Sequence, residues 1–486
     1  MLTFGLSTIL MFDMEFAADT LHLIDRDIAL QYRVLPKGKE GRLLSLYCEA
    51  QAYGSSLADE LQVILGVEVK LEGLEETEIT RLLSTHYLNG PSAELPEKQL
   101  SAISSGGDFL HTLIDEARKL KSSDIHIETF EKKARVRIRI DGMMIERYQV
   151  VKEDYPALVN KIKIMANLDI AEKRLPQDGR IHYKSTAHQA FDIRVSVLPT
   201  LHGEKIVLRL LSNSSTDIDL HTLGLSVADM DNYMQGVQRP NGIILISGPT
   251  GSGKTTTLYA TLKLLNKTTR NILTIEDPIE YTLEGINQVQ LKENIGLGFA
   301  SALRTFLRQD PDVIMVGEIR DPETANMAIR AALTGHLVLS TIHTNSAWGT
   351  VSRLMDMGIP GFLVGNTLNT TVAQRLVRML CSSCKKKTDF SANLYPRQFK
   401  PAVMLDYHYV PCGCADCYFT GYKGRKAVYE VIPIDAELAQ QIKQGNMDIA
   451  PLLKERNIQT LAENAFALFA DGKTSIEEIY PLLLTL

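Results

Sequence analysis

The chain has 486 residues, too many for a single hydrophobic core, and at about 150 residues per domain this length predicts roughly three folded units. Its formal net charge of -6 at pH 7 argues against a protein that coats nucleic acid through a general positive charge. Five of the 6 cysteines lie between residues 381 and 417, which indicates metal ligation in a reducing compartment rather than a distributed disulfide framework.

The N-terminal apolar stretch, residues 2–12, does not have the flanks of a signal peptide. No lysine or arginine precedes it, and Asp13 and Glu15 follow it. No apolar run in the sequence approaches the roughly 18 residues that a membrane-spanning helix needs. We therefore expect a cytoplasmic protein that associates with a membrane only through partners.

Two breaks interrupt the first quarter of the chain. Residues 88–96 contain two prolines and a glycine, which predicts a linker, and residues 104–108 offer a second break with a candidate helix N-cap. Apolar residues then recur at helical spacing from Phe109 to Ala117. A new domain should begin there.

Strands with one solvated face should come next. Residues 134–140 alternate apolar and cationic side chains, and Asp141-Gly142 is a turn signal, so a hairpin is expected. Residues 191–197 alternate in the same way. Such alternation is typical of half-buried strands.

From residue 242 to about residue 380 the pattern changes to uncharged apolar runs separated by helices. Strands are expected at 242–246, 271–275, 312–316 and 337–342, and helices at 300–308 and 323–333. This alternation predicts a parallel α/β sheet. After Glu430 the apolar spacing is that of short amphipathic helices.

The phosphate-binding pattern G-x-x-x-x-G-K-[ST] follows the strand at 242–246 and opens a helix. Its glycines let backbone N–H groups face the phosphates, Lys254 should meet the β- and γ-phosphates, and Thr255 should offer its hydroxyl to Mg²⁺. An ordinary glycine-rich turn is the alternative, although strand, loop and helix come in the required order. The residues expected to hold the nucleotide are Gly248, Pro249, Thr250, Gly251, Ser252, Gly253, Lys254, Thr255 and Thr256.

Hydrolysis also needs a carboxylate that orients the attacking water. Gly317 and Glu318 follow the apolar run 313–316, so a glycine stands where P-loop enzymes commonly have a metal-holding aspartate. We expect Glu318 to be the general base or water-positioning residue. A glutamate that only starts a helix is the alternative.

Three acids, Glu276, Asp277 and Glu280, follow the strand at 271–275. Open α/β sheets bind ligands at the carboxyl ends of their strands, so these acids should face the Mg-nucleotide, unless they form a solvated acidic turn. His336 and His343 flank the strand at 337–342, and His343 at its exit could reach the γ-phosphate. Either histidine alone is equally compatible with an ordinary polar role.

Two C-x-x-C pairs predict a metal centre. Four thiolates at paired spacing suit tetrahedral Zn²⁺ and leave no open position for a substrate, so the site should be structural. Cys412 could replace Cys414 as the third ligand, and a redox pair is the competing interpretation. The expected ligands are Cys381, Cys384, Cys414 and Cys417.

On these residues, the stretch from about 100 to 430 resembles the secretion ATPases of type II secretion and type IV pilus assembly, a bacterial superfamily of hexameric motors. The resemblance covers the P-loop and three further motifs, which are similar to the family's Asp box, Walker B region and His box: residues 275–281, 303–321 and 334–344. Residues 123–128, 174–180 and 203–205 resemble the family's second N-terminal domain, a PAS-like sheet that packs over the nucleotide.

The resemblance implies roles for further residues. It places His336 and His343 at the nucleotide site, and it implies that cationic side chains of the PAS-like domain reach the γ-phosphate and couple domain rotation to hydrolysis. Arg180 and Arg194 occupy the matching motif positions, with Arg209 a weaker candidate. A solvated strand face is the alternative for each arginine.

The expected architecture is an α/β protein with a RecA-like P-loop ATPase core behind a PAS-like α+β domain, a tetracysteine zinc module and a helical C-terminal region. The expected domains are a partner-docking domain (1–95), the PAS-like domain (96–215), the ATPase domain (216–380), the zinc module (381–428) and the helical region (429–486).

The tetracysteine module and the extra N-terminal domain resemble the extension and secretion branch of the family. The implied protein is a homo-hexameric, ATP-hydrolysing motor that uses Mg²⁺ and Zn²⁺ and drives an inner-membrane platform protein, so that pilins enter a filament. It would lie at the inner membrane through that protein and the cytoplasmic domain of a bitopic partner, with no nucleic acid bound. A RecA-like nucleic-acid translocase and a scaffold with a dead nucleotide site are the alternatives.

Overall fold

The computed structural model describes residues 109–184, 190–211, 219–391, 394–401 and 403–484, together with shorter stretches between residues 23 and 99. The chain divides into two compact units, residues 1–96 and 97–486. The linker predicted at 88–96 and the helix cap predicted at 104–108 lie outside the described residues. Among the described residues, no helix combines the length and the apolar character that a membrane span requires.

The first unit contains a three-stranded sheet in the order β1-β2-β3, formed by β1 (Leu35–Glu40), β2 (Leu43–Glu49) and β3 (Glu68–Leu74). Strands β1 and β2 are antiparallel, whereas β3 runs parallel to β2 after the helix α3 (Ser55–Leu65). Buried apolar residues such as Leu44, Leu46 and Leu61 form its core.

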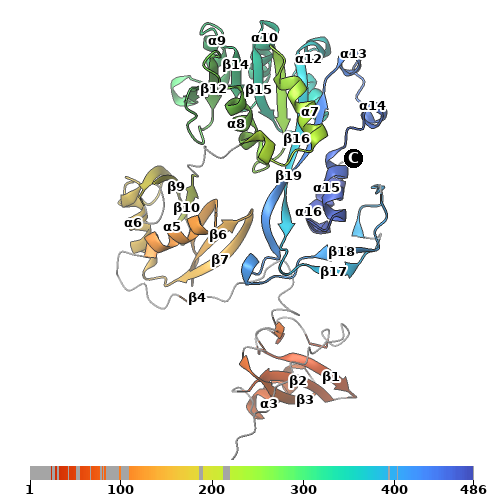
Figure 1. The fold of residues 1–486 in the computed structure, drawn as a ribbon. Coiled ribbons are helices and arrows are strands. Elements are labelled where there is room, and N and C mark those ends of the chain that lie inside the picture. The colour runs from red at the N-terminus through yellow and green to blue at the C-terminus, as the bar shows by residue number, and fades with distance from the viewer. Residues whose placement is uncertain are drawn as a thin grey trace, which may run out of the picture. The chain divides into compact units, whose positions relative to one another are not determined.

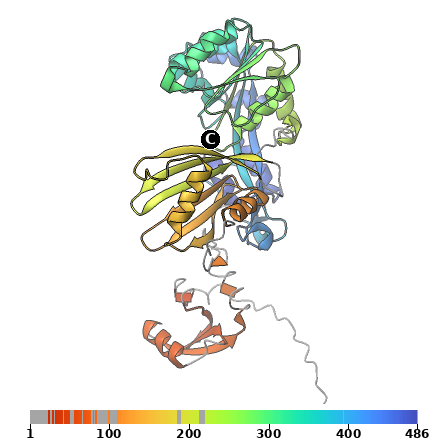
Figure 2. The ribbon, with the colours of Figure 1, turned by 90° about the vertical axis from the view of Figure 1, so that its left-hand side faces the viewer.

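The second unit begins with a seven-stranded sheet in the order β4-β7-β6-β5-β10-β9-β8 (Figures 1 and 2). Its neighbours are antiparallel except for the edge pair β4 and β7. The strands are β4 (Lys98–Gln99), β5 (Asp124–Thr129), β6 (Ala134–Ile140), β7 (Met143–Val150), β8 (Gln177–Tyr183), β9 (Phe191–Thr200) and β10 (Gly203–Leu210).

Helices α5 (Phe109–Lys119) and α6 (Tyr155–Met165) pack on the apolar face of this sheet. The predicted alternation is confirmed: Val136 and Ile138 are buried in the core, while the intervening arginines are partly exposed. The predicted hairpin is confirmed as well. Asp141 and Gly142 adopt φ of 48° and 88°, the left-handed conformation that closes a tight hairpin.

A second seven-stranded sheet carries the phosphate-binding loop, in the order β13-β12-β14-β15-β11-β16-β19 (Figure 1). The parallel sheet predicted from residue 242 to about residue 380 is confirmed, and the first six strands run parallel to one another. These strands are β11 (Gly242–Ser247), β12 (Ile272–Glu276), β13 (Asn287–Gln290), β14 (Val313–Val316), β15 (Leu337–Ile342) and β16 (Leu368–Leu380).

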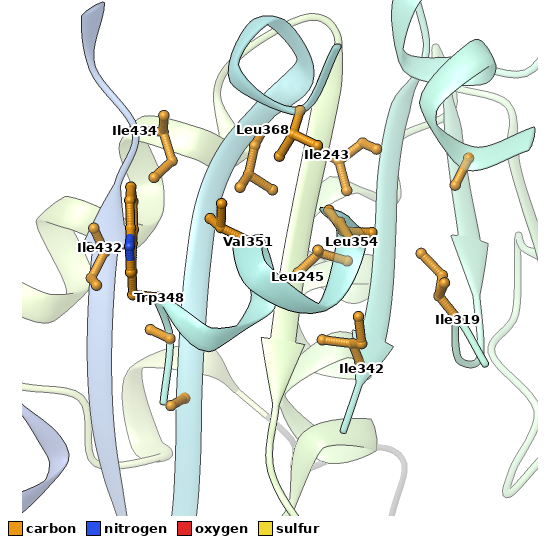
Figure 3. Packing of buried hydrophobic residues seen from close by; sticks show 14 of the residues in the cluster. Ile243, Leu245, Ile319, Ile342, Trp348, Val351, Leu354, Leu368, Ile432 and Ile434 are labelled. Atoms are coloured by element: carbon orange, nitrogen blue, oxygen red, sulfur yellow. The ribbon is translucent and has the colours of Figure 1, made fainter. Parts of the chain in front are cut away.

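Helices cover both faces of this sheet, which gives two separate apolar cores. One face is covered by α7 (Val227–Val237) and α8 (Lys254–Leu265). The other is covered by α9 (Phe299–Phe306), α10 (Pro322–Leu333), α11 (Gly349–Asp356) and α12 (Gly361–Thr367). Figure 3 shows Trp348, Val351 and Leu354 packed over the strands on this second face.

The sheet extends beyond the predicted ATPase range of 216–380. Its last strand, β19 (Tyr422–Pro433), returns antiparallel to β16 after the cysteine-rich segment. That segment contains the small hairpin of β17 (Lys386–Asp389) and β18 (Tyr407–Val410). The short C-terminal helices predicted after Glu430 are confirmed as α13 (Ala436–Gln444), α14 (Ala450–Glu455), α15 (Leu461–Ala470) and α16 (Ile476–Leu483).

Candidate functional site

The loop between β11 and α8 has the backbone that a phosphate-binding loop requires. Gly248 and Gly253 have φ of 149° and 88°, and a Cβ there would lie 2.5 Å from the Gln374 carbonyl oxygen and 2.8 Å from Gln374 Nε2, respectively. A side chain at either position would be both strained and blocked. Helix α8 begins at Lys254, so its first backbone N–H groups face the loop and favour an anion.

Lys254 lies folded against the loop. Its Nζ donates to the carbonyl oxygens of Gly248 at 2.7 Å and Pro249 at 3.1 Å. Burial lowers the pKa of Lys254, although the nearby carboxylate of Glu318 acts in the opposite direction. A partly desolvated ammonium gains more from a phosphate partner than one in bulk water would.

Glu318 lies at the end of β14 beside two cationic side chains. One carboxylate oxygen pairs with Arg320 Nη2, and Oε2 lies 3.4 Å from His343 Nε2 at the exit of β15. The side chain of Glu318 is only 15% exposed. The structure therefore brings Glu318 and His343 together.

The space around residue 317 is narrow, which favours a glycine directly before Glu318. A Cβ at residue 317 would lie 3.3 Å from the Ile275 carbonyl oxygen and 3.4 Å from Glu276 Cα. The ends of β12 and β14 thus approach closely, and an aspartate Cβ at this place would require the neighbouring backbone to shift by a few tenths of an ångström. Glycine lets the two strand ends come together.

The three acids after β12 have different environments. Asp277 Oδ2 lies 4.0 Å from Arg320 Nη1, which places it near Glu318. Glu276 is 3% exposed, and its oxygens accept hydrogen bonds from the side chains of Tyr259, Thr274 and Gln288. The carboxylate of Glu276 is hydrogen-bonded inside the fold, which differs from the expectation that it faces the nucleotide.

His336 lies at the start of β15, whereas His343 lies at its end. The imidazole Nδ1 of His336 lies 2.9 Å from the Ala331 carbonyl oxygen and 3.1 Å from Thr334 Oγ1. The two histidines flank the six residues of β15 and are seven residues apart, which corresponds to about 23 Å at about 3.3 Å per residue. Within one chain, His336 is therefore not brought to the phosphate-binding loop, contrary to the expectation.

The three candidate arginines form one row across the antiparallel sheet. Arg194 on β9 is paired in register with Arg180 on β8 and with Arg209 on β10, so all three project from the same face. Arg194 Nη2 donates to the Ile279 carbonyl oxygen at 2.5 Å, and its Nη1 lies 3.4 Å from Glu280 Oε2. This arginine directly contacts the segment that follows the acidic turn.

Arg180 and Arg209 are paired within their own sheet. Arg180 pairs with Asp192, and Arg209 Nε donates to Asp124 Oδ1 at 2.9 Å. Both guanidinium groups remain more than half exposed. Arg194 thus contacts the acidic segment, whereas Arg180 and Arg209, its neighbours in the row, have exposed guanidinium groups.

Sequence reasoning missed two residues of β16 that support the loop. Gln374 is 2% exposed and accepts a hydrogen bond from Thr257 Oγ1 at 2.9 Å. Arg375 donates to the Asn345 carbonyl oxygen at 3.1 Å, and burial lowers its pKa. The available signal was that Gln374 is a polar residue within the run of seven buried residues that begins β16, with Arg375 directly after it.

A cavity of about 270 Å³ opens beside the start of α8. Its wall includes Asp141, whose Oδ2 accepts a hydrogen bond from Gly424 N at 2.7 Å and whose Oδ1 lies 3.5 Å from Arg425 Nε. The turn of the antiparallel sheet thus closes one side of the cavity. The lining residues are Asp141, Leu223, Gly253, Thr256, Thr257, Gln374, Leu376 and Arg425.

The four predicted cysteine ligands converge, with sulfur atoms within 4.8 Å of one another. The sulfur atoms of Cys381 and Cys414 are 3.9 Å apart, and those of Cys384 and Cys417 and of Cys414 and Cys417 are each 3.8 Å apart. Tetrahedral Zn–S bonds of about 2.3 Å place their sulfur atoms about 3.8 Å apart, so the group fits zinc.

The surroundings of these sulfur atoms also suit thiolates. Backbone N–H groups of Gly413, Cys414 and Gly421 donate to Sγ of Cys384 or Cys417 at 3.2–3.3 Å. Cys412 is not part of the converging group. The geometry therefore favours Cys414 as the third ligand.

The doubly covered parallel sheet and its glycine loop define a P-loop nucleoside-triphosphate-binding protein. Residues 104–481 match the family model described as Type II/IV secretion system protein. The chain therefore belongs to the family of type II secretion and type IV pilus assembly ATPases.

Named relatives agree with this membership. The type IV pilus assembly ATPase PilB of Myxococcus xanthus is 40% identical, over 98% of this chain and 88% of its own length. The putative type II secretion system protein E of Escherichia coli is 48% identical, over 76% of this chain and 75% of its own. The type II secretion system ATPase E of Vibrio cholerae is 45% identical, over 76% and 74%.

Solved structures show the same fold. The ATPase DotB of Legionella pneumophila has a TM-score of 0.59 at 23% identity and matches 77% of this chain and 95% of its own. The pilus retraction motor PilT, solved with bound ADP, has a TM-score of 0.52 at 27% identity and matches 76% and 95%.

Proposed function

We propose that this chain is an ATP-hydrolysing hexameric motor that powers assembly of a type IV pilus or a type II secretion pseudopilus at the inner membrane. The observation that carries the proposal is the convergence of Lys254, Glu318 and His343 at one edge of a P-loop sheet, in a chain whose relatives are named for pilus assembly and type II secretion. The cytoplasmic location and the absence of a nucleic-acid substrate remain part of this proposal.

Each part of the site has a proposed chemical role. The loop N–H groups and Lys254 bind the β- and γ-phosphates, Thr255 ligates Mg²⁺, and Glu318 orients or deprotonates the attacking water. Asp277 lies close enough to Arg320 and Glu318 to bind metal-coordinated water. His343 beside Glu318 would sense the γ-phosphate.

The nucleoside end fits the cavity beside α8. That cavity adjoins Gly253 and Thr256, the point where a phosphate chain bound by the loop leaves it. Its mixed polar and apolar wall suits a base and ribose. Asp141 and Arg425 would then contact the nucleoside or its waters.

The antiparallel sheet would transmit the motion. We propose that this sheet is the PAS-like domain of residues 96–215, and that Arg194 and Arg180 neutralise charge on the γ-phosphate when the sheet closes on a nucleotide. Arg194 already contacts the segment after the acidic turn. Release of phosphate would let the antiparallel sheet move away from the nucleotide site, and this movement would rotate an inner-membrane platform protein.

The remaining regions have supporting roles. The three-stranded N-terminal unit would dock on a cytoplasmic domain of a bitopic inner-membrane protein. The four cysteines would bind a structural Zn²⁺, which would hold the ends of the long β16–β19 hairpin together.

The test is steady-state ATP hydrolysis by the wild type and by Glu318→Gln, with and without DNA. Loss of the general base should lower kcat by about 10²–10⁴-fold while Mg-ATP still binds. Glu323→Gln is the matched control, because this nearby glutamate is exposed on α10 and pairs with Arg304. Equal rates for wild type and Glu318→Gln would remove Glu318 as the base, and strong stimulation by DNA would favour a nucleic-acid translocase.

A further inference from the structure

Glu430 is a buried carboxylate to which the proposed hydrolysis mechanism assigns no direct role. Glu430 on β19 is 5% exposed, and its oxygens accept hydrogen bonds from Ala347 N at 2.8 Å and Leu461 N at 3.0 Å. Burial raises the pKa of Glu430, while the two N–H groups and the charge of Arg375 oppose this shift. A buried carboxylate is tolerated only with such partners, so both contacts are expensive to lose.

The first contact reaches the segment that directly follows His343. Residues 344–347 are also held by Ser247 Oγ, which donates to the Ser346 carbonyl oxygen at 3.3 Å, and by Arg375, which donates to the Asn345 carbonyl oxygen at 3.1 Å. Ser247 is the last residue of β11, immediately before the phosphate-binding loop. The segment 344–347 thus joins the loop, His343 and β19.

The second contact reaches the C-terminal helices. Leu461 is the first residue of α15, which Thr460 and Glu463 cap from the exposed side. Apolar residues of α15, including Ala465 and Phe466, belong to the core that also contains Trp348 and Val351. A single carboxylate therefore ties the beginning of α15 to the segment behind His343.

We propose that Glu430 is a positioning residue for ATP hydrolysis. It holds the segment 344–347, and with it His343, at the position that His343 needs beside Glu318. Because Glu430 also binds the first residue of α15, the placement of His343 depends on the position of α15. This inference rests on the proposed ATPase function. It assigns the C-terminal helices a regulatory part, since a partner that displaces α15 would change kcat without contacting the nucleotide.

The chain contains a built-in reporter for this link. Trp348, its only tryptophan, directly follows Ala347 and is 8% exposed. Its indole Nε1 has no hydrogen-bond partner among the described residues. The fluorescence of Trp348 should therefore respond when the segment 344–347 moves.

The decisive variant is Glu430→Gln in the full chain, because glutamine keeps one acceptor oxygen and turns an amide NH₂ toward the other N–H. We expect kcat to fall about tenfold or more, with the KM for ATP changed less than about twofold, and the Trp348 emission to shift. Glu463→Gln is the matched control at the exposed side of the same helix start, and it should leave kcat and emission unchanged.

A double-mutant cycle separates positioning from general destabilisation. If Glu430 acts through His343, then Glu430→Gln should lower kcat no further in a His343→Ala background. An unchanged kcat in Glu430→Gln, or full multiplication of the two effects in the double variant, would overturn the proposal.

A measurement on the wild type keeps the test independent of how the variants fold. Binding of a non-hydrolysable ATP analogue with Mg²⁺ should change the Trp348 emission, and a constant emission under saturating analogue would contradict the link. If the wild type itself does not hydrolyse ATP, the proposed function fails, whereas this emission response still decides whether the link exists.

Discussion

Glu128 is the charged centre of the antiparallel sheet. Its carboxylate oxygens accept hydrogen bonds from Arg135 at 3.0 Å and Arg137 at 2.8 Å, and Lys205 Nζ lies 2.9 Å away. Burial alone would raise the pKa of Glu128, but these three cations outweigh it and lower the pKa to about 2. The ionised form is therefore favoured by folding.

The direction of the resulting pH dependence follows from this lowered pKa. A carboxyl group whose pKa falls from 4.5 to about 2 on folding stabilises the folded state above about pH 4.5, and this contribution is lost as the pH falls toward 2. We expect Glu128→Gln to lower the free energy of unfolding by about 1–3 kcal/mol at pH 7 and by roughly half of that or less at pH 3, where the contribution is partly lost. Urea unfolding followed by circular dichroism at both pH values measures this difference, and an equal loss at both would contradict it.

The sequence predicted which residues follow the strands of the nucleotide-binding sheet, but it did not predict the direction in which each side chain points. Glu276 and Asp277 are neighbours, yet Glu276 points to Tyr259 inside the fold and Asp277 points toward Arg320. Side chains alternate at the end of a strand, so adjacent acids face different sides, and a motif alone does not tell which side holds the ligand. His336 and His343 differ for a related reason, because they lie at opposite ends of one strand.

At the scale of elements, periodicity predicted the four central strands β11, β12, β14 and β15 and the helices α9 and α10, but not the pairing of β16 with β19. These strands lie on either side of the cysteine-rich segment, and β19 belongs to a stretch that was divided between the zinc module and a helical region. Long-range antiparallel pairing leaves no local signal comparable to a turn residue.

The two cysteines that precede the 3₁₀ turn Ala415–Cys417 provide a sharp test of the metal centre. We expect Cys414→Ser to lose bound zinc and to weaken the folded hairpin, because Cys414 belongs to the converging group. Cys412→Ser is the matched control and should keep one zinc per chain by elemental analysis. If Cys412→Ser lost its zinc while Cys414→Ser kept it, Cys412 and not Cys414 would be the third ligand.

At the scale of the whole molecule, composition and motifs predicted a multi-domain ATPase, and the α/β fold of its nucleotide-binding sheet agrees. What the sequence could not supply was the set of contacts between distant segments. Asp141 meets Gly424, and Arg194 meets Ile279, although no local pattern links these positions. Such contacts depend on how separately folded sheets come together.

Assembly is the prediction that belongs to this scale. In the presence of Mg²⁺ and a non-hydrolysable ATP analogue, we expect a particle of about six times the chain mass of 54.1 kDa, measured by light scattering after size exclusion. Because the proposed motor works as a hexamer, kcat should rise with protein concentration as the subunits assemble. A particle of single-chain mass that hydrolyses ATP at full rate would contradict the motor model.

The β16–β19 hairpin has a further consequence for how this architecture can vary. Leu380 is paired with Tyr422, and Cys381 N donates to the Gly421 carbonyl oxygen at 2.9 Å, so the chain leaves and re-enters the sheet at adjacent points. Residues 382–420 are thus an insertion into a hairpin that a turn of a few residues could close. The cysteine module is in this sense a cassette inserted at one point of the sheet, but Phe399 in it belongs to the same core as Phe466, so a replacement module would have to supply this apolar contact again.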